Sequence, residues 1–199
     1  MRPARRSVAA QTNSTMARTP STMLPLGTVA PDFALPDAVT GKTVRLADFA
    51  GAPVLLVMFI CNHCPYVKHV NAELVRVAKD YGERGVGFIA ISSNDVAGYP
   101  DDAPDRMQST AKQFGYPFPY LYDKSQDVAR AYRAACTPDL YLFDPELSLV
   151  YRGQLDGSRP GKGEPDGRDL RGALDALLSG KSIDPDQKPS VGCNIKWRA

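Results

Sequence analysis

The sequence contains no long apolar segment and few cysteines. None of its apolar runs approaches the roughly 18 residues that a membrane-spanning helix needs, which argues against a membrane span. Within residues 1–23 the longest apolar run covers only positions 8–10, too short for the apolar core of an export signal. A chain of 199 residues can bury a stable hydrophobic core without disulfide bonds, so its four cysteines need not form structural disulfides. We therefore expect a cytoplasmic protein that does not associate with membranes.

A concentrated basic stripe is also missing. Lysine and arginine number 24 against 22 acidic residues, but four of the arginines lie in residues 1–23, which contain no acid. The rest of the chain therefore holds 20 basic and 22 acidic residues, and it has no cluster of basic residues that could bind the phosphates of a nucleic acid. We expect no nucleic-acid partner. Residues 1–23 are interpreted as a disordered leader, although their composition also suits an organelle transit peptide.

Apolar periodicity predicts alternating strands and helices. A buried strand over 54–60 precedes an amphipathic helix that begins near Asn62 and ends at Gly82, and a second buried strand follows over 86–92. Such a strand–helix–strand unit predicts parallel strands. The remaining pattern predicts helices near 104–115, 125–134 and 170–178, and strands over 120–122, 140–144 and 149–152, the last two as an antiparallel hairpin.

The ends of the domain are less periodic. The turn signal Thr40-Gly41-Lys42 lies between two short extended pieces and predicts an N-terminal β-hairpin. The chain shows no internal repeat and no linker between domains. We expect one α/β domain over residues 24–180, followed by a C-terminal tail over 181–199.

The motif Cys61-Asn62-His63-Cys64 stands where the first buried strand gives way to the helix. A helix N-terminus stabilises a thiolate, so we expect a lowered pKa and a nucleophilic role for Cys61, with Cys64 as the resolving thiol. A donor or cation on His63 would favour the thiolate further, although a solvated histidine is the alternative. The same motif could also be a structural pair or half of a zinc site. Zinc is disfavoured because Cys136 and Cys193 are isolated in the sequence, so no metal and no cofactor are expected.

A second segment, Ala135-Cys136-Thr137-Pro138-Asp139, precedes the strand over 140–144. With it, the chain over residues 26–178 resembles a thioredoxin-fold redoxin, in the peroxiredoxin-like branch of the alkyl hydroperoxide reductase/thiol-specific antioxidant family. The opening segments 30–35, 41–42 and 46–51 and the closing segment 192–197 carry the same resemblance. It implies a thioredoxin-like fold, with a mixed central β-sheet flanked by helices. It also implies a cis Thr137–Pro138 bond facing the two cysteines, with the backbone of Thr137 pairing to a bound substrate.

The chain departs from this family at informative positions. Peroxiredoxins carry Pro-x-x-x-Thr/Ser-x-x-Cys, whereas this chain has Val54 and Met58 before Cys61. Thioredoxins carry a tryptophan and a buried aspartate at the positions of Ile60 and Leu55. The missing hydroxyl argues against the usual route of peroxide reduction. The missing carboxylate leaves His63 or water as the base for Cys64.

The sequence is compatible with three functions. The first is a thiol–disulfide oxidoreductase that cycles Cys61 and Cys64. The second is an antioxidant thiol peroxidase with Cys61 as the peroxidatic cysteine. The third is a metal-binding protein that uses Cys61, Cys64, Cys136 and His63. The expected partners are protein or small-molecule disulfides or peroxides, together with a thiol reductant.

Two further cysteines are candidate auxiliary thiols. The expected cis-proline loop would bring Cys136 near Cys61 and Cys64, where it is either a functional thiol or a small buried apolar side chain. Cys193 either pairs with Cys136 or remains an exposed thiol. Thr137 and Pro138 are the expected substrate-binding residues.

Overall fold

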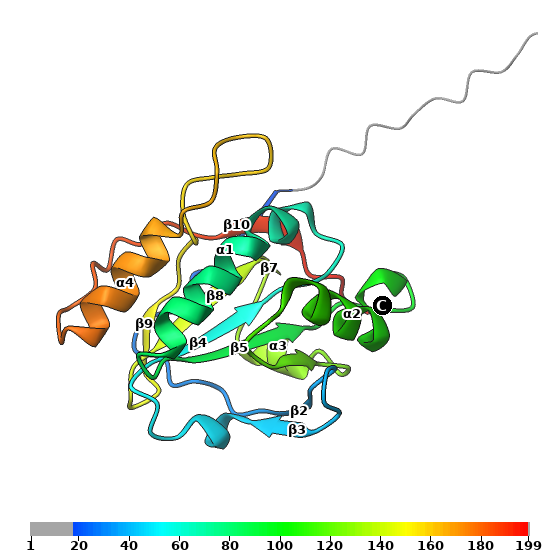
Figure 1. Cartoon of the computed structure of the whole chain (residues 1–199), viewed down its shortest axis with the longest axis horizontal. Coiled ribbons are helices and arrows are strands. Elements are labelled where there is room, and N and C mark those ends of the chain that lie inside the picture. The colour runs from blue at the N-terminus through cyan, green and yellow to red at the C-terminus, as the bar shows by residue number, and fades with distance from the viewer. Residues whose placement is uncertain (1–17, 199) are drawn as a thin grey trace, which may run out of the picture.

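The computed structural model describes residues 18–198 of the chain. Its centre is a mixed sheet of five strands (Figure 1). In spatial order these strands are β6 (Tyr120–Tyr122), β5 (Gly87–Ser92), β4 (Leu55–Phe59), β8 (Asp139–Phe143) and β9 (Leu149–Tyr151). The pairs β4–β5 and β5–β6 are parallel, and the pairs β4–β8 and β8–β9 are antiparallel. The predicted parallel unit and the predicted antiparallel hairpin are both confirmed.

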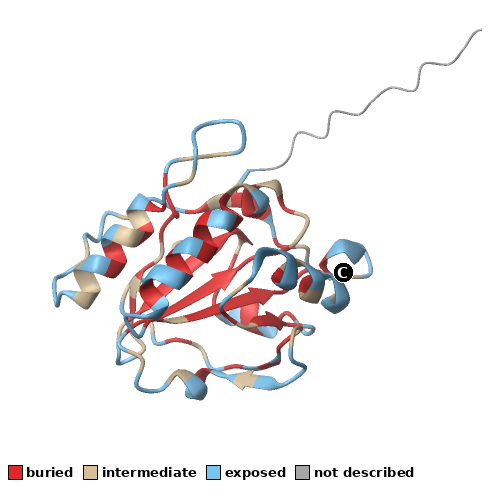
Figure 2. Cartoon of the chain, viewed as in Figure 1, coloured by how far each residue is buried: buried red, intermediate tan, exposed pale blue. Residues whose placement is uncertain are grey.

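Strand β4 is buried on both faces. Leu56 and Met58 belong to one apolar cluster, and Leu55, Val57 and Phe59 belong to another on the opposite face of the sheet. Because side chains alternate along a strand, two covered faces require apolar residues at every position. That requirement explains the uninterrupted apolar run of this segment. In Figure 2 the central strands are buried throughout, whereas the helices are buried only on their inner sides.

Helices cover the two faces unequally. The first cluster contains the buried side chains of α1 (Pro65–Gly82), α2 (Pro104–Phe114) and α4 (Arg168–Leu178). The second cluster contains residues of the shorter helix α3 (Asp127–Ala131) and of the N-terminal segment. That segment includes the hairpin of β2 (Ala34–Pro36) and β3 (Thr43–Arg45), followed by the 3₁₀ helix η1 (Leu46–Phe49). The expected N-terminal hairpin is therefore confirmed.

A second, small sheet joins the two ends of the described chain. Its strand order is β1 (Thr19–Pro20), β10 (Val191–Asn194) and β7 (Cys136–Thr137), and both pairs are antiparallel. Within the expected leader, residues 1–17 lie outside the described residues. Thr19 and Pro20, however, pair with the C-terminal segment, and the expected tail provides the middle strand. These short strands lack periodicity and form only through pairing between distant segments.

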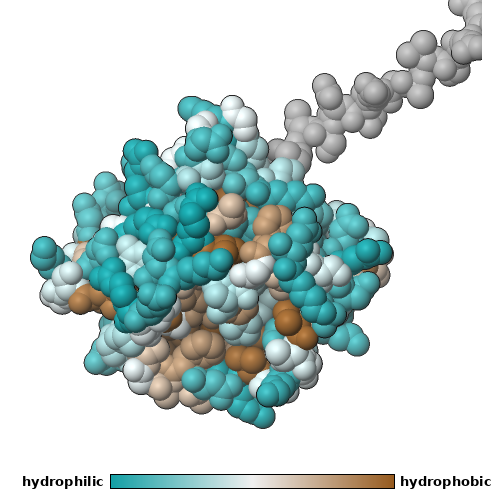
Figure 3. Space-filling model, viewed as in Figure 1, coloured by the Kyte–Doolittle hydropathy of each residue, from teal (hydrophilic) through white to brown (hydrophobic). Residues whose placement is uncertain are grey.

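Helix α1 begins later than the apolar spacing predicts. Pro65 is its first residue and Cys64 is its N-cap, with extended backbone angles. The predicted start near Asn62 is wrong by three residues, because proline is favoured at the first helical position and cannot follow an earlier turn without losing a hydrogen bond. Over residues 18–198 no helix has the length and apolar character needed to cross a bilayer. The visible surface is largely hydrophilic, with scattered apolar residues (Figure 3).

Candidate active site

The two cysteines of the C-x-x-C motif lie between the end of β4 and the start of α1. Both are buried, with exposed fractions of 1% for Cys61 and 0% for Cys64. The backbone N–H of Ile60 donates to the carbonyl of Ile91 at 3.0 Å, which continues the ladder up to the first cysteine. The carbonyl of Cys64 accepts from the N–H of Lys68 at 2.9 Å, which is the first bond of the helix. The motif is therefore anchored at both ends by regular structure.

Thr137 faces both sulfur atoms. Its hydroxyl oxygen lies 3.3 Å from the Cys61 sulfur, and its carbonyl oxygen lies 3.1 Å from the Cys64 sulfur, which donates to it. The Thr137–Pro138 peptide bond is cis, as the resemblance implied. The resemblance implied that the Thr137 backbone pairs with a bound substrate, but another strand of the protein already pairs with it. Strand β10 already occupies that edge of β7, with Cys193 opposite Thr137.

His63 is held by a buried acid that the sequence analysis did not identify. Its Nδ1 donates to the carboxylate of Asp102 at 2.6 Å, and its ring stacks on Tyr99 with a centroid separation of 5.2 Å. Asp102 lies at the end of the 3₁₀ helix η2 (Pro100–Asp102) and is fully buried. Its carboxylate also accepts from the backbone N–H groups of Asn62 and His63 and from the side chain of Asn94. This network positions the residues between the two cysteines.

The charge on Asp102 is stabilised by these donors. Burial raises the pKa of this carboxyl, but the hydrogen bonds from His63 and Asn94 outweigh burial, so the pKa is lowered overall. Asp102 is therefore an ionised group beside the thiols. No periodic or motif signal in the sequence marks it, since 39 residues separate it from His63.

The negative charge of the thiol pair is favoured on Cys64 rather than on Cys61. Hydrogen bonds from Cys193 and Cys61 lower the pKa of Cys64. The pKa of Cys61 is raised well above its usual value by the hydrogen bond to Cys64, by burial and by the charge of Asp102. The expected low pKa of Cys61 is therefore wrong for this arrangement. Helix α1 starts at Pro65, so the N-cap position belongs to Cys64 rather than to Cys61.

All four cysteines are free and buried, but they are not equivalent. A hydrogen bond with Cys64, together with burial, raises the pKa of Cys193. Cys136 points to backbone carbonyls, with sulfur–oxygen distances of 3.5 Å to Pro138 and 3.9 Å to Ser190. Burial also raises the pKa of Cys136. Of the two candidate auxiliary thiols, only Cys193 therefore contacts the C-x-x-C pair, and its expected exposure is wrong.

The expected set of metal ligands is not assembled. Within residues 18–198, one group of three potential ligand atoms lies within 4.8 Å of one another, and it consists of Cys61, His63 and Asp102. Cys64 and Cys136 do not belong to it. The Asp102 oxygens are already engaged by His63, Asn94 and two backbone N–H groups. This group is consequently better described as a hydrogen-bonded network than as a metal centre.

Two hollows flank the thiol pair. A cavity of about 320 Å³ is lined by Cys61, by Lys68 and Asn71 of α1, by Phe114 of α2 and by Tyr116 just after α2, whereas Cys64 does not line it. Of the two cysteines of the motif, Cys61 is therefore the one beside this cavity. The second hollow, of about 20 Å³, lies beside Pro138.

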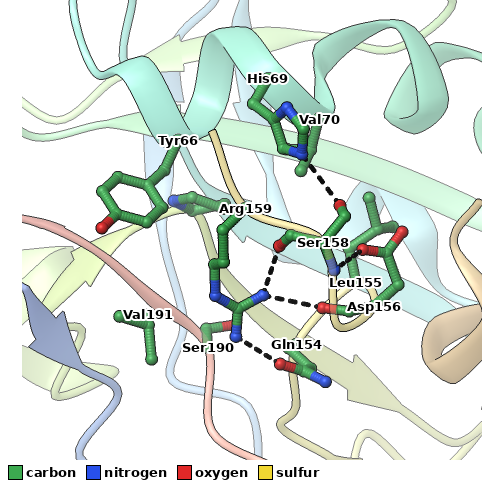
Figure 4. A pocket seen from close by; sticks show the side chains of 11 residues that line it. Tyr66, His69, Val70, Gln154, Leu155, Asp156, Ser158, Arg159, Ser190 and Val191 are labelled. Atoms are coloured by element: carbon green, nitrogen blue, oxygen red, sulfur yellow. Dashed lines mark hydrogen bonds between the residues drawn. The ribbon is translucent and has the colours of Figure 1, made fainter. Parts of the chain in front are cut away.

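The second hollow is built from a hydrogen-bonded loop (Figure 4). In it, the guanidinium of Arg159 donates to Gln154 and to the carbonyls of Asp156 and Ser158. His69, which the sequence analysis gave no role, lies 2.9 Å from the Ser158 hydroxyl through its Nε2. This loop closes the hollow to little more than the space of one water molecule.

The fold and the paired thiols define a thioredoxin-fold oxidoreductase. The AhpC/TSA family model matches residues 26–152, and the chain belongs to that family. A thiol-disulfide oxidoreductase ResA from Geobacillus kaustophilus is 30% identical over 141 residues, which cover 69% of this chain and 75% of that protein.

Solved structures agree with this assignment. An uncharacterized conserved protein from Geobacillus kaustophilus is 56% identical, with a TM-score of 0.90 over 92% of this chain and 97% of that one. A thioredoxin-family thiol:disulfide interchange protein from Chlorobium tepidum is 18% identical, with a TM-score of 0.60 over 76% of this chain and 97% of that one. At that identity the likeness shows the fold alone. The expected thioredoxin-like fold is confirmed.

Proposed function

We propose that this protein is a thiol–disulfide oxidoreductase that cycles Cys61 and Cys64 between a dithiol and a disulfide. The observation that carries the proposal is the division of roles between the two sulfurs. Cys61 lines the cavity between α1 and α2, while Cys64 lies outside that cavity and its thiol donates to the Thr137 carbonyl at 3.1 Å. The similarity to a thiol-disulfide oxidoreductase ResA supports the same reaction class.

The exchange begins with a proton transfer inside the pair. Once Cys64 is ionised, the thiol proton of Cys61 passes to the Cys64 thiolate as the Cys61 sulfur attacks a substrate disulfide, which releases one substrate sulfur as a thiolate. Cys64 thereby acts as the base that the missing thioredoxin carboxylate would otherwise supply. The hydroxyl of Thr137, 3.3 Å from the Cys61 sulfur, donates to the charge that develops there.

The second step closes the protein disulfide. The Cys64 sulfur attacks the Cys61 sulfur of the mixed disulfide, and the second substrate thiol leaves with the Cys64 proton. The substrate is reduced by two electrons and the protein is oxidised to the Cys61–Cys64 disulfide. A thiol reductant then restores the dithiol. Disulfides are the proposed substrates, and a cytoplasmic location stays a prediction.

Substitution of each cysteine tests this function. Cys61→Ser should abolish reduction of a chromogenic aryl disulfide, because the attacking sulfur is removed. Cys64→Ser should instead accumulate a mixed disulfide on Cys61, visible as an added mass in the intact protein. Cys136→Ala is the matched control and should retain the wild-type rate. Full exchange activity in the Cys61→Ser protein would refute the proposal.

Peroxide reduction is the second candidate function. The observation that favours it is the Thr137 hydroxyl beside the Cys61 sulfur, a hydroxyl that the sequence lacks at Met58. The test is the second-order rate at which reduced protein loses the Cys61 thiol to hydrogen peroxide, compared with the Thr137→Val protein. A rate far above that of a free thiol, lost in Thr137→Val, would support peroxide reduction. A rate near that of a free thiol would leave disulfide exchange as the function.

A further inference from the structure

A third thiol lies beside the resolving cysteine. Strand β10 places Cys193 directly opposite Thr137, the residue whose carbonyl accepts from Cys64 and whose hydroxyl contacts Cys61. Cys193 belongs to the same buried apolar cluster as both cysteines of the motif. A hydrogen bond with Cys64 also raises the pKa of the Cys193 thiol. Cys61, Cys64 and Cys193 are thus gathered around Thr137 in one buried cluster.

The backbone around Cys193 holds it closely in this place. Gly192 packs so tightly on Thr137 that a Cβ atom added to it would lie 1.9 Å from the Thr137 carbonyl oxygen. The N–H of Ile195 donates to the carbonyl of Ala135 at 3.1 Å, which continues the pairing along β7, and β1 pairs with the other edge of β10. Cys193 is therefore presented to Cys64 by regular β-pairing on both sides. A thiol held this way against a resolving cysteine is well placed for exchange.

We propose that Cys193 is a third redox-active thiol, which takes over the disulfide from Cys61 and leaves Cys61 reduced. The proposal rests on the Cys61–Cys64 exchange of the proposed function and extends it by one step. It makes the protein a relay in which Cys61 meets the substrate and the Cys64–Cys193 disulfide stores the oxidation.

The step is an internal thiol–disulfide exchange. The Cys193 sulfur attacks the Cys64 sulfur of the Cys61–Cys64 disulfide, so one S–S bond forms as the other breaks. Cys61 leaves as a thiolate and receives the proton that Cys193 gives up. No outside oxidant or reductant takes part, since the number of disulfides is unchanged. The free Cys61 can then attack another substrate, or a reductant can act on the Cys64–Cys193 disulfide.

Cys136 does not fit this role, although it lies in the same region. Its sulfur is directed to the carbonyls of Pro138 and Ser190. It therefore provides a matched control, because it is a buried cysteine on the strand that pairs with β10 and its thiol is directed to backbone carbonyls.

Disulfide mapping tests the relay on the wild-type protein. Reduced protein is oxidised with one equivalent of a small disulfide, quenched with acid and alkylated at successive times, then digested without reduction. We expect a linked peptide that joins Cys64 to Cys193, with Cys61 alkylated in the same species, appearing after the Cys61–Cys64 disulfide. Cys193→Ser should remove this species and lower the rate of multiple turnover, whereas Cys136→Ala should change neither.

The outcomes separate the relay from the function on which it rests. If the Cys61–Cys64 disulfide forms and Cys193 is alkylated at every time, the relay is refuted and the exchange function stands. If the Cys61–Cys64 disulfide never forms and substrate is not reduced, the proposed function itself fails. The wild-type mapping is decisive even if a cysteine variant does not fold.

Discussion

The buried carboxyl of Asp139 should make stability depend on pH. This residue begins β8 directly after the cis-proline and is 1% exposed. Burial raises its pKa to about 6, even though its carboxylate accepts from the N–H of Ala135 and the hydroxyl of Tyr141. An aspartate in the unfolded chain has a pKa of about 3.9. Between these values the folded state binds the proton more tightly than the unfolded chain, so the free energy of unfolding falls as pH rises.

The size of the effect follows from this interval. Two pH units between the unfolded and folded pKa correspond to roughly 3 kcal/mol, present below the unfolded pKa and lost by the time pH passes the folded pKa. Asp139→Asn has a neutral side chain of the same shape at every pH, so its free energy of unfolding should not fall by this amount as pH rises. We therefore expect the variant to gain about 3 kcal/mol relative to wild type between about pH 4 and pH 7.

Urea unfolding of the reduced proteins over this pH range measures the difference directly. Other titrating groups are common to both proteins and cancel when the two free energies are subtracted. Asp186→Asn, which removes the same charge from an exposed position, is the control and should show a flat difference. A difference between wild type and Asp139→Asn that does not change with pH would refute the reasoning.

Two further predictions concern the strand contact and the charge beside the thiols. Gly192→Ala should separate β10 from β7, since its Cβ would meet the Thr137 oxygen at 1.9 Å, and should cost about 1–3 kcal/mol in thermal unfolding. Gly157→Ala, with open space around it, is the control, and equal costs would contradict the contact argument. Asp102→Asn should speed alkylation of Cys61 at neutral pH. The hydrogen bond to Cys64 and burial raise the Cys61 pKa most, the charge of Asp102 raises it further, and the substitution removes that charge. Slower or unchanged alkylation, read by mass spectrometry, would count against this.

The sequence predicted the elements that depend on local pattern. The run of apolar residues in β4 and the helical spacing in α1 each report burial against the sheet, so both elements and their parallel connection followed from the sequence. The antiparallel pair β8–β9 followed from the turn at Asp144-Pro145-Glu146. In each case the residues that form the element also carry the signal.

The missed features depend on residues far apart in the chain. Strands β1, β7 and β10 contain two to four residues each, too few to show a period of two, and they exist because they pair with one another. Asp102 reaches His63 from a loop after β5, and no single segment contains both partners. Long-range pairings of this kind leave no trace in a window of sequence.

One error was avoidable from the sequence. Pro65 is a strong marker for the first position of a helix, and using it would have placed the start of α1 three residues later than the apolar spacing did. The correct start assigns the N-cap to Cys64.

The position of β10 also affects how the protein is made. Domains form as the chain is synthesised from its N-terminus, so Cys61 and Cys64 emerge well before Cys193. Until β10 is present, the edge of β7 that it pairs with is unpaired. The side-chain oxygen of Asn94 also has no hydrogen bond from the backbone N–H of Lys196, which lies 2.8 Å from it in the finished protein. The nascent domain therefore exposes two thiols without the strand that covers them. Its redox site becomes complete only when the final residues of the described chain have folded into place.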